Sequence, residues 1–581
     1  MLFPDRAAYA LVENIADKGR SGRMSECAAK AKYPATSGER WTWCTAREAE
    51  ALFAGTKELA VLDVREQGEF TRGHILLASC VPLSRLELLA EDLVPCRRTL
   101  IVLVDDGDEK CSPRAERAAS RLADIGYSQL RVLKGGMRAW LSEGLTEVSG
   151  VGALSKGFGE YVESRLHTPA LDPAEVKQLL EQERNSVIID VRPRDEYTRM
   201  NIPGGINAPG CEVLYRFADL VPDANTTVII NCAGRTRSII GTQTLLNAGV
   251  PNRVFALKGG TMNWRLSGLS LAFGTAECSA PPSLKSIEYA RQRAFAIAEA
   301  FAIPFAEADE VHAWQKEADG TTLYLFDVRQ PEEFETGHLP GSRNAPGGQL
   351  VQSTDEYAAV RNARFVLVDD TEIRAIMTAH WLKQMGLPHV YVLRGGLGGS
   401  GLGAGGLDTG TVAPACSYAP PATETIPAPV LAARLEAAPA CLVINVGGSG
   451  AHRKGHIPRA AWVARGYLEL AHACHPDATE VVVTSDTEYH ARLAAADAAL
   501  LWDKAPVRVL AGGNPAWASG GFPLATGMPW ALCAEDDAWY RPYQDPDASP
   551  DAMHSYFDWE FGLVERIRKD GAVSFQLFEK K

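Results

Sequence analysis

A long internal repeat is the strongest constraint on the fold of this chain. An apolar run that ends in Asp-Val-Arg occurs three times, with its aspartate at Asp63, Asp190 and Asp327, and a weaker copy begins at Asn445. Successive copies lie 127, 137 and 118 residues apart, which is the length of an ordinary domain and not of a solenoid unit. A chain of 581 residues is also too long for a single hydrophobic core. We therefore expect four successive domains of one fold.

Each copy repeats the same order of features. In the first three copies acidic and aromatic residues follow the first apolar run. Every copy then has a Gly-His or Ile-Pro-Gly turn and finally a strand that ends in two glycines. The glycine pairs are Gly135-Gly136, Gly259-Gly260, Gly395-Gly396 and Gly512-Gly513. Short apolar strands alternate with helical patterns in every copy, which indicates a parallel sheet with helices on both faces. On such sheets ligands bind at the carboxyl ends of the strands.

The repeats predict the domain boundaries. We expect an N-terminal extension at 1–44, domains at 45–148, 149–272, 304–405 and 426–527, a linker helix at 273–303, a linker at 406–425 and a C-terminal tail at 528–581. The tail is rich in aromatic residues, which would be costly to expose, so we expect it to pack across the domains. Its pattern predicts a helix near residues 560–568 and a final strand at 573–578.

The second copy contains the motif that carries chemistry, Cys232-Ala233-Gly234-Arg235-Thr236-Arg237-Ser238. It follows an apolar run and leads into a helical pattern from Ser238 to Leu246. This order places the Cys232 thiol over the first free N–H groups of a helix. Arg235 and Arg237 add positive charge, which favours the thiolate and offers donors to an anionic substrate. We interpret Cys232 as a nucleophile.

These motifs in this order resemble the rhodanese (sulfurtransferase) family. The Asp-Val-Arg run, the Gly-His or Ile-Pro-Gly turn, the strand that ends on Cys232 and the Lys-Gly-Gly ending before Trp264 carry the resemblance. It covers roughly residues 45 to 527, and the layout is similar to the four-module thiosulfate sulfurtransferases of bacteria. The resemblance implies an α/β fold of four tandem rhodanese-like modules, each a mainly parallel sheet flanked by helices.

The resemblance also implies a two-step sulfur transfer. The Cys232 thiolate attacks the outer sulfur of thiosulfate, or of a thiol persulfide, and becomes a persulfide. A thiophilic acceptor, such as cyanide or a thiol, then takes that sulfur. The implied substrate-binding residues are the rest of the loop, Ala233, Gly234, Arg235, Thr236, Arg237 and Ser238. The loop amides would hold the persulfide, and the two arginines would hold the oxygens of the donor. No metal or organic cofactor is needed.

The other three copies lack a cysteine at this position. Cys232 lies 42 residues after Asp190, and the same distance in the first and third copies leads to an aspartate at the end of an apolar strand, while the fourth copy has a serine after its strand. These residues are Asp105, Asp369 and Ser485. An aspartate cannot carry a sulfane sulfur, and a serine without a base is a poor nucleophile at neutral pH. We predict that only the second module is catalytic.

Several other residues have a structural interpretation. Asp190 and Arg192 recur in copies without a nucleophile, so we expect a structural ion pair that supports the site. Lys258 also has basic counterparts in the silent copies, which favours a role in stabilising the turn. Cys211 is a second thiol near the motif, but isolated cysteines are usually passive.

Composition and charge limit the partners. The net charge is −13, which argues against binding nucleic acid. The sequence has no apolar run near the 18 or so residues that a bilayer requires and no hydrophobic signal core, so we expect no membrane partner and a cytoplasmic location. Twelve scattered cysteines and histidines without ligand spacing suggest neither a disulfide framework nor a metal site. The expected partners are a small-molecule sulfur donor and acceptor, and the acceptor can be a low-molecular-weight or a protein thiol.

Two alternatives remain open from the sequence. Three silent copies in four are compatible with a non-catalytic scaffold or sulfur carrier built from rhodanese modules. A cysteine phosphatase is a weaker alternative, because such enzymes place an arginine six residues after the cysteine, and that position here is Ser238.

Overall fold

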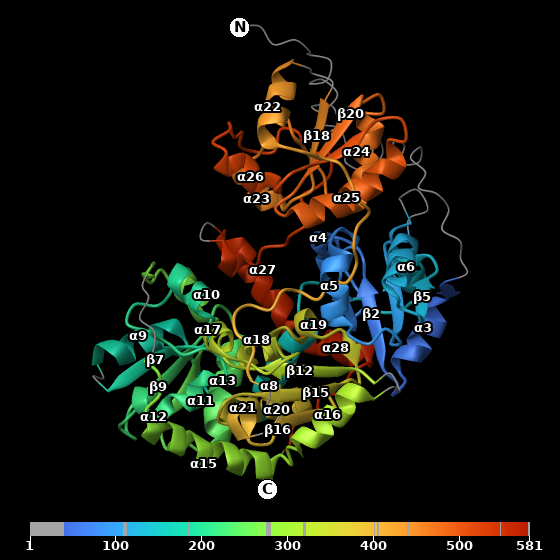
Figure 1. Ribbon diagram of the computed structural model, residues 1–581. Coiled ribbons are helices and arrows are strands. Elements are labelled where there is room, and N and C mark those ends of the chain that lie inside the picture. Colours follow the sequence, from blue (N-terminus) through green and yellow to red (C-terminus); the bar gives the residue numbers. More distant parts are fainter. Residues whose placement is uncertain are drawn as a thin grey trace.

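The computed structural model describes residues 40–107, 113–182, 185–274, 280–317, 321–399, 401, 403, 406–437, 441–545 and 548–578. Most of the predicted N-terminal extension lies outside the described residues, as does Cys111. The described chain forms four sheets, one for each copy of the repeat. In Figure 1 the fourth module (orange) lies above the first (blue), and the second (teal to green) and third (yellow) lie below.

The four sheets share one topology. Counted along each module, the strands lie in the order first, fifth, fourth, second, third, and their ladders within a module are parallel. The first sheet contains β1 (Thr42–Cys44), β2 (Leu59–Asp63), β3 (Ala78–Cys80), β4 (Leu100–Val104) and β5 (Leu130–Leu133). The second contains β6 (Ala170–Leu171), β7 (Ser186–Asp190), β8 (Ile206–Asn207), β9 (Thr227–Asn231) and β10 (Val254–Leu257). The third contains β11 (Phe305–Ala306), β12 (Leu323–Asp327), β13 (Arg343–Asn344), β15 (Arg364–Val368) and β16 (Val390–Leu393). The fourth contains β17 (Thr425–Ile426), β18 (Cys441–Asn445), β19 (Ala461–Trp462), β20 (Glu480–Thr484) and β21 (Val507–Leu510).

Helices cover both faces of each sheet, and the central strands are therefore continuous apolar runs. The first module has α3 (Ala46–Phe53), α4 (Gln67–Arg72), α5 (Leu86–Leu93), α6 (Arg114–Ile125), α7 (Gly136–Ser142) and the 3-10 turn η1 (Leu83–Arg85). The second has α8 (Ala153–Leu166), α9 (Pro173–Gln182), α10 (Arg194–Arg199), α11 (Glu212–Tyr215), α12 (Phe217–Leu220), α13 (Thr236–Asn247) and α14 (Gly260–Leu266). The third follows α15 (Leu284–Ala300) and has α16 (Ala308–Lys316), α17 (Pro331–Thr336), α18 (Gly347–Gln352), α19 (Thr354–Tyr357), α20 (Ile373–Gln384) and α21 (Gly396–Gly399). The fourth has α22 (Ala428–Ala437), α23 (Ser449–Lys454), α24 (Leu468–Cys474), α25 (Glu488–Leu501), α26 (Gly513–Ser519) and η2 (Arg465–Tyr467).

Two strands differ from the sequence prediction. Residues 42–44, which we assigned to the N-terminal extension, form β1 and pair with β5 of the first sheet. The extra strand β14 (Val360–Arg361) of the third module pairs antiparallel with β2 of the first. Both strands are very short and lack a clear alternating pattern, so their pairing depends on the neighbouring chain rather than on local sequence.

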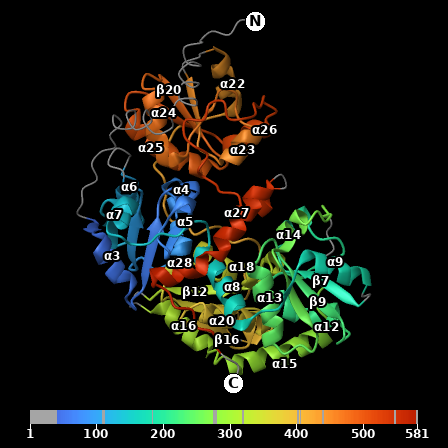
Figure 2. The ribbon, with the colours of Figure 1, turned by 180° about the vertical axis from the view of Figure 1, so that it is seen from behind.

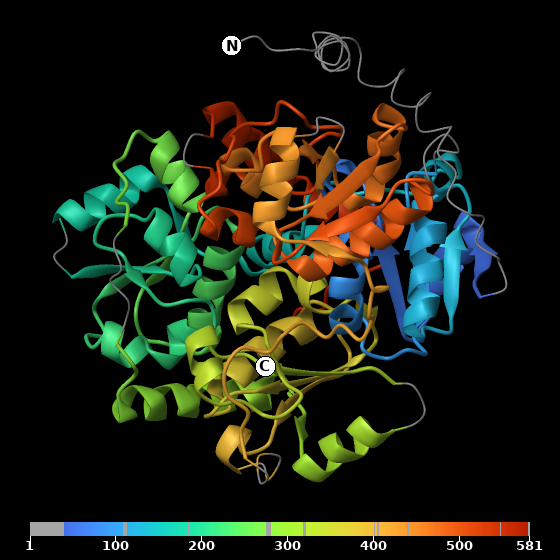
Figure 3. The same cartoon turned by 45° about the horizontal axis from the view of Figure 1, so that its top comes forward.

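Buried ion pairs join the modules in two pairs. The second and third modules meet where Arg374 pairs with Glu212 at 2.7 Å, and both side chains are fully buried. The first and fourth meet where Arg465 pairs with Glu87 at 2.6 Å, again with both side chains buried. The view from above in Figure 3 shows the fourth module next to the first. Each module therefore packs its loop side against a partner module.

The C-terminal tail runs back across the other modules. Its helices are η3 (Pro542–Gln544), α27 (Pro550–Phe561) and α28 (Leu563–Asp570), and α27 and α28 pack against α8. Seen from behind, α28 lies next to α8 in the centre of the molecule (Figure 2). The predicted helix at 560–568 is thus two helices that meet at Gly562. The predicted strand at 573–578 is wrong, because this segment bonds to Gln384 at the end of α20, where there is no strand edge to extend.

No helix in the described part of the chain has both the length and the apolar character needed to cross a membrane.

Candidate active site

The motif loop connects a central strand of the second sheet to a helix. β9 ends at Asn231, Cys232 opens the loop, and α13 begins at Thr236. Cys232 is 1% exposed, and its Sγ lies 3.5 Å from the hydroxyl oxygen of Ser238. The Ser238 hydroxyl donates to the Arg235 carbonyl at 2.8 Å, which ties the two ends of the loop together. The thiol therefore lies at the carboxyl end of a parallel strand, as the sequence predicts.

The double-glycine turn explains why each copy of the repeat ends in two glycines. The amide of Thr261 donates to the Cys232 carbonyl at 2.8 Å, and the amide of Met262 donates to the Ala233 carbonyl at 3.0 Å. Gly260 has a φ of +54°, and a Cβ there would lie 2.3 Å from the Cys232 carbonyl oxygen. Only glycine permits this close approach in the left-handed region. The turn therefore fixes the start of the catalytic loop.

Arg235 is held by helix α8. Its guanidinium donates to Glu160 at 2.7 and 2.9 Å and also pairs with Glu163. It stacks over the Phe561 ring, with 4.4 Å between the guanidinium carbon and the ring centroid. The side chain is 8% exposed. Its donors are thus engaged by two carboxylates.

Arg237 is held by α10 and by the third module. It donates to both carboxylate oxygens of Glu196, at 2.9 and 2.8 Å, and to Gln349 at 3.3 Å. Burial raises the pKa of Glu196, but the charge of Arg237 outweighs burial and brings that pKa down to about 2. The structure therefore pairs both arginines of the loop with carboxylates, and contact between them and a substrate stays a prediction.

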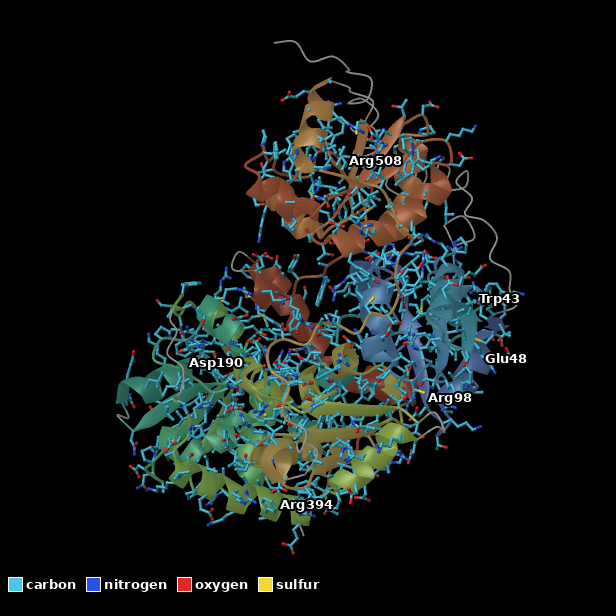
Figure 4. The ribbon with its side chains drawn as sticks, in the orientation of Figure 1. Trp43, Glu48, Arg98, Asp190, Arg394 and Arg508 are labelled. Carbon is cyan, nitrogen blue, oxygen red and sulfur yellow. The ribbon has the colours of Figure 1, made fainter. Side chains whose placement is uncertain are left out.

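Asp190 and Arg192 form an ion pair below the loop. Arg192 donates to Asp190 at 2.7 and 2.9 Å and to the Met200 carbonyl at 2.7 Å. Asn231 also donates to Asp190, at 2.7 Å, so the pair is tied to the end of β9. The same ion pair occurs at Asp63 and Asp327 in the silent modules. Figure 4 labels Asp190 in the second module. These residues position the strand ends and do not reach the thiol.

Ala233 and Gly234 of the loop face the C-terminal tail. Ala233 packs in one apolar cluster with Tyr543, Met553, Tyr556 and Phe557 of the tail. A Cβ at Gly234 would lie 3.5 Å from Oε2 of Glu560 and 3.8 Å from Cε1 of Tyr556. The hydroxyl of Thr236 is buried without a hydrogen-bond partner. The tail therefore covers the loop directly.

Sequence reasoning missed the residues outside the loop that surround the thiol. Lys156 of α8 and Arg541, Tyr556 and Glu560 of the tail are all near it. Their only signal in the sequence was the aromatic content of the tail, which indicated packing but not its target. By contrast, Lys258 pairs with Asp172 at 3.0 Å on the surface, and burial raises the pKa of Cys211 to about 12, which fits a passive thiol.

The silent modules fill the nucleophile position with hydrogen-bonded oxygen atoms. The Asp369 carboxylate accepts from the Arg374 amide at 3.1 Å and from the Thr371 hydroxyl at 2.9 Å. Asp105 accepts from the amides of Gly107 and Ala115, both at 3.0 Å. These carboxylates occupy the loop amides that an anionic sulfur would need.

The fourth module corrects one part of the sequence argument. We expected Ser485 to lack a base, but its hydroxyl lies 2.9 Å from Nδ1 of His490. Nε2 of His490 lies 2.8 Å from the Ser84 carbonyl oxygen, which can only accept, so Nδ1 accepts from Ser485 in the neutral ring. Burial lowers the pKa of His490 to about 4, with Arg465 acting in the same direction. Ser485 is fully buried, and the silence of this module stays a prediction.

Comparison with known proteins gives the family. The family model for the rhodanese-like domain matches residues 45–143, 172–267 and 307–399. A solved structure described as thiosulfate sulfurtransferase from Pseudomonas aeruginosa is 43% identical, covers 93% of this chain and 100% of its own, and superimposes with a TM-score of 0.88. This chain belongs to the rhodanese family. The strand order of the fourth sheet repeats that of the other three, although the family model does not extend to it.

Two curated proteins match over single modules. The uncharacterized protein YqhL of Bacillus subtilis is 40% identical over 73 residues, which is 12% of this chain and 56% of YqhL. The HTH-type transcriptional regulator Rv0324 of Mycobacterium tuberculosis is 32% identical over 87 residues, which is 15% of this chain and 38% of the regulator. The chain thus spans about half or less of the length of these relatives.

Proposed function

We propose that this chain is a thiosulfate sulfurtransferase that moves a sulfane sulfur from thiosulfate, or from a thiol persulfide, to a thiophilic acceptor through a Cys232 persulfide. The observation that carries the proposal is the place of Cys232, at the start of the loop between β9 and α13. Its counterparts in the described silent modules are carboxylates or a serine. The similarity to a thiosulfate sulfurtransferase along 93% of the chain supports the same reaction.

In the first half-reaction the Cys232 thiolate attacks the outer sulfur of thiosulfate. A new S–S bond forms, the original S–S bond breaks, and its electron pair leaves with sulfite. The enzyme is then a persulfide anion. The amides of residues 233–238 lie at the start of α13, where the helix dipole stabilises negative charge. Ser238 lies 3.5 Å from Sγ and is a further polar group beside the sulfur.

In the second half-reaction a nucleophilic acceptor attacks the terminal sulfur of the persulfide. The Cys232 thiolate leaves, so the enzyme returns to its starting state and the kinetics are ping-pong. Cyanide is the acceptor of the assay, and a low-molecular-weight or protein thiol is the proposed acceptor in the cell. Arg235 and Arg237, through their ion pairs, hold the loop and add positive charge near the sulfur.

The proposal is tested by thiocyanate release from thiosulfate and cyanide. Wild type is expected to turn over, Cys232→Ser to lose the activity, and Cys416→Ser, which changes a cysteine in the linker before the fourth module, to keep it. Mass spectrometry after thiosulfate treatment is expected to find one added sulfur on Cys232. If wild type does not turn over but Cys232 holds a stable added sulfur, the chain is a sulfur carrier. Full activity in Cys232→Ser contradicts the proposal.

A further inference from the structure

A group of polar side chains around Cys232 comes from outside the motif loop. Lys156 lies on α8, and Arg541, Tyr556 and Glu560 lie in the C-terminal tail. We call these four residues the tail cluster. Lys156, Tyr556 and Glu560 are 2%, 5% and 1% exposed. The cluster therefore combines two distant parts of the chain over the catalytic loop.

The polar atoms of this region lack partners. Tyr556 Oη, Glu560 Oε2 and Arg541 Nε are buried without a hydrogen bond of good geometry, although Tyr556 lies close enough to Glu560 to lower the pKa of that carboxyl. The Thr236 hydroxyl of the loop is also buried without a partner. Lys156 makes no ion pair or hydrogen bond among the residues that the structure describes. A buried polar group without a partner costs about 1–3 kcal/mol, and such groups are rare. Several of them around one thiol indicate a place for a polar ligand.

The charges of the cluster favour an anion. Burial lowers the pKa of Lys156 to about 8, the Glu560 carboxylate opposes this, and Arg541 and Arg237 lower it further. Burial raises the pKa of Glu560 to about 7, and Lys156 only partly offsets that effect. Arg541 pairs with Glu356 at 3.3 Å and Arg237 pairs with Glu196 at 2.8 Å, so Lys156 is the cation of this group that an arriving anion would meet. Glu560 is the one carboxylate of the cluster, and its raised pKa lets it take up a proton when an anion arrives.

A cavity of about 110 Å³ is lined by Ser155 at the start of α8 and by residues of the first and third modules, Asp355 among them. No residue of the tail cluster lines this cavity, but Lys156 and Arg541 both act on the carboxyl of Asp355. The cavity is large enough for several water molecules.

We propose that the tail cluster is the binding site for the oxygen-bearing end of an inorganic sulfur oxyanion, the sulfonate group of thiosulfate before transfer and sulfite after it. Lys156 supplies positive charge, Arg541 adds to it from its pair with Glu356, and Tyr556 supplies a hydroxyl donor. The loop arginines do not perform this task, because Glu160, Glu163 and Glu196 engage them. This inference rests on the proposed function, since it names the part of the chain that selects the donor.

Binding without turnover tests the proposal. The full-length Cys232→Ser protein cannot form a persulfide, so calorimetry with thiosulfate measures the subsite alone. Adding Lys156→Gln is expected to weaken thiosulfate binding about 10- to 100-fold, the range for hydrogen bonds to charged groups. Adding Tyr556→Phe is expected to weaken it about 2- to 10-fold. Lys177→Gln and Tyr540→Phe remove the same groups from exposed positions and serve as matched controls without effect.

Turnover supplies an independent readout. With Cys232 present, Lys156→Gln is expected to raise KM for thiosulfate and weaken inhibition by sulfite, and to leave KM for cyanide unchanged. If Lys156→Gln does not fold, Tyr556→Phe decides, because it removes a single oxygen. Normal turnover together with unchanged thiosulfate binding in both variants overturns the subsite but not the sulfurtransferase. If thiosulfate binding depends on Lys156 but the wild-type protein does not turn over, the subsite is supported and the proposed function is contradicted.

Discussion

The ion pair between the first and fourth modules allows a quantitative prediction. Arg465 donates to both oxygens of Glu87, at 2.6 and 2.9 Å, and to Asp497 at 2.7 Å. Arg465 and Glu87 are each 1% exposed. Arg465→Met leaves Glu87 with Arg121 alone, at 3.1 Å. Removing one partner of a buried ion pair lowers the free energy of unfolding by about 3–5 kcal/mol, because the charge of the other partner stays buried.

Hydrogen exchange is the appropriate assay, because a four-module chain does not unfold in a single step. In Arg465→Met the amides of β20 and β21 are expected to lose protection by roughly 100-fold or more. Arg453→Met is the matched control in the same module, since its pair with Glu535 is 55% and 35% exposed and contributes at most about 1 kcal/mol. Thiocyanate release stays unchanged in both variants, because Cys232 lies in another module. If β20 and β21 are equally protected from hydrogen exchange in Arg465→Met and Arg453→Met, the buried ion pair does not stabilise the fourth module as argued.

Two further predictions concern the silent modules and pH. The double variant Cys232→Ser, Asp369→Cys moves the thiol to the third module and is expected to release no thiocyanate. The reason is the negative charge of Asp370, Glu333 and Glu212 around the loop at residue 369. Turnover of the double variant contradicts this. Burial lowers the pKa of His380 from 6.5 to about 4, so the stability that its neutral form contributes is complete above pH 6.5 and is lost as the pH falls to about 4. Between pH 7 and pH 5 this loss is about 2 kcal/mol. Hydrogen exchange is expected to show it as lost protection of the α20 amides in wild type and to show less in His380→Gln, and an equal loss in both rules out the assignment.

The internal repeat made it possible to predict the fold and the position of Cys232 from the sequence. Four copies with the same spacing place equivalent residues at the same strand ends, so one cysteine among aspartates and a serine was readable without coordinates. Arg237 lies five residues after Cys232, and the same spacing after Ser485 leads to His490. The histidine beside Ser485 could therefore have been found from the sequence. The partners of Arg235 could not, because Glu160 and Glu163 lie on a helix more than 70 residues earlier. Contacts of that kind depend on how modules and tail pack, which no local pattern encodes.

The pairing of modules gives the arginines of two equivalent loops different partners. Glu196 and Glu333 stand 6 residues after their repeat aspartates, and Glu212 and Gln349 stand 22 residues after them. Arg237 of the catalytic loop meets Glu196 of its own module and the neutral Gln349 of the third. Arg374 of the silent loop meets Glu333 and the charged Glu212 of the second, with Asp369 and Asp370 beside it. One carboxylate thus faces the arginine of the catalytic loop among the described residues, against four at the silent loop. The exchange of one glutamate for glutamine across the interface therefore gives Arg237 a neutral partner where Arg374 has a charged one. Because like charges repel an arriving anion, we predict that thiosulfate is held less well at the third-module loop than at the loop of Cys232.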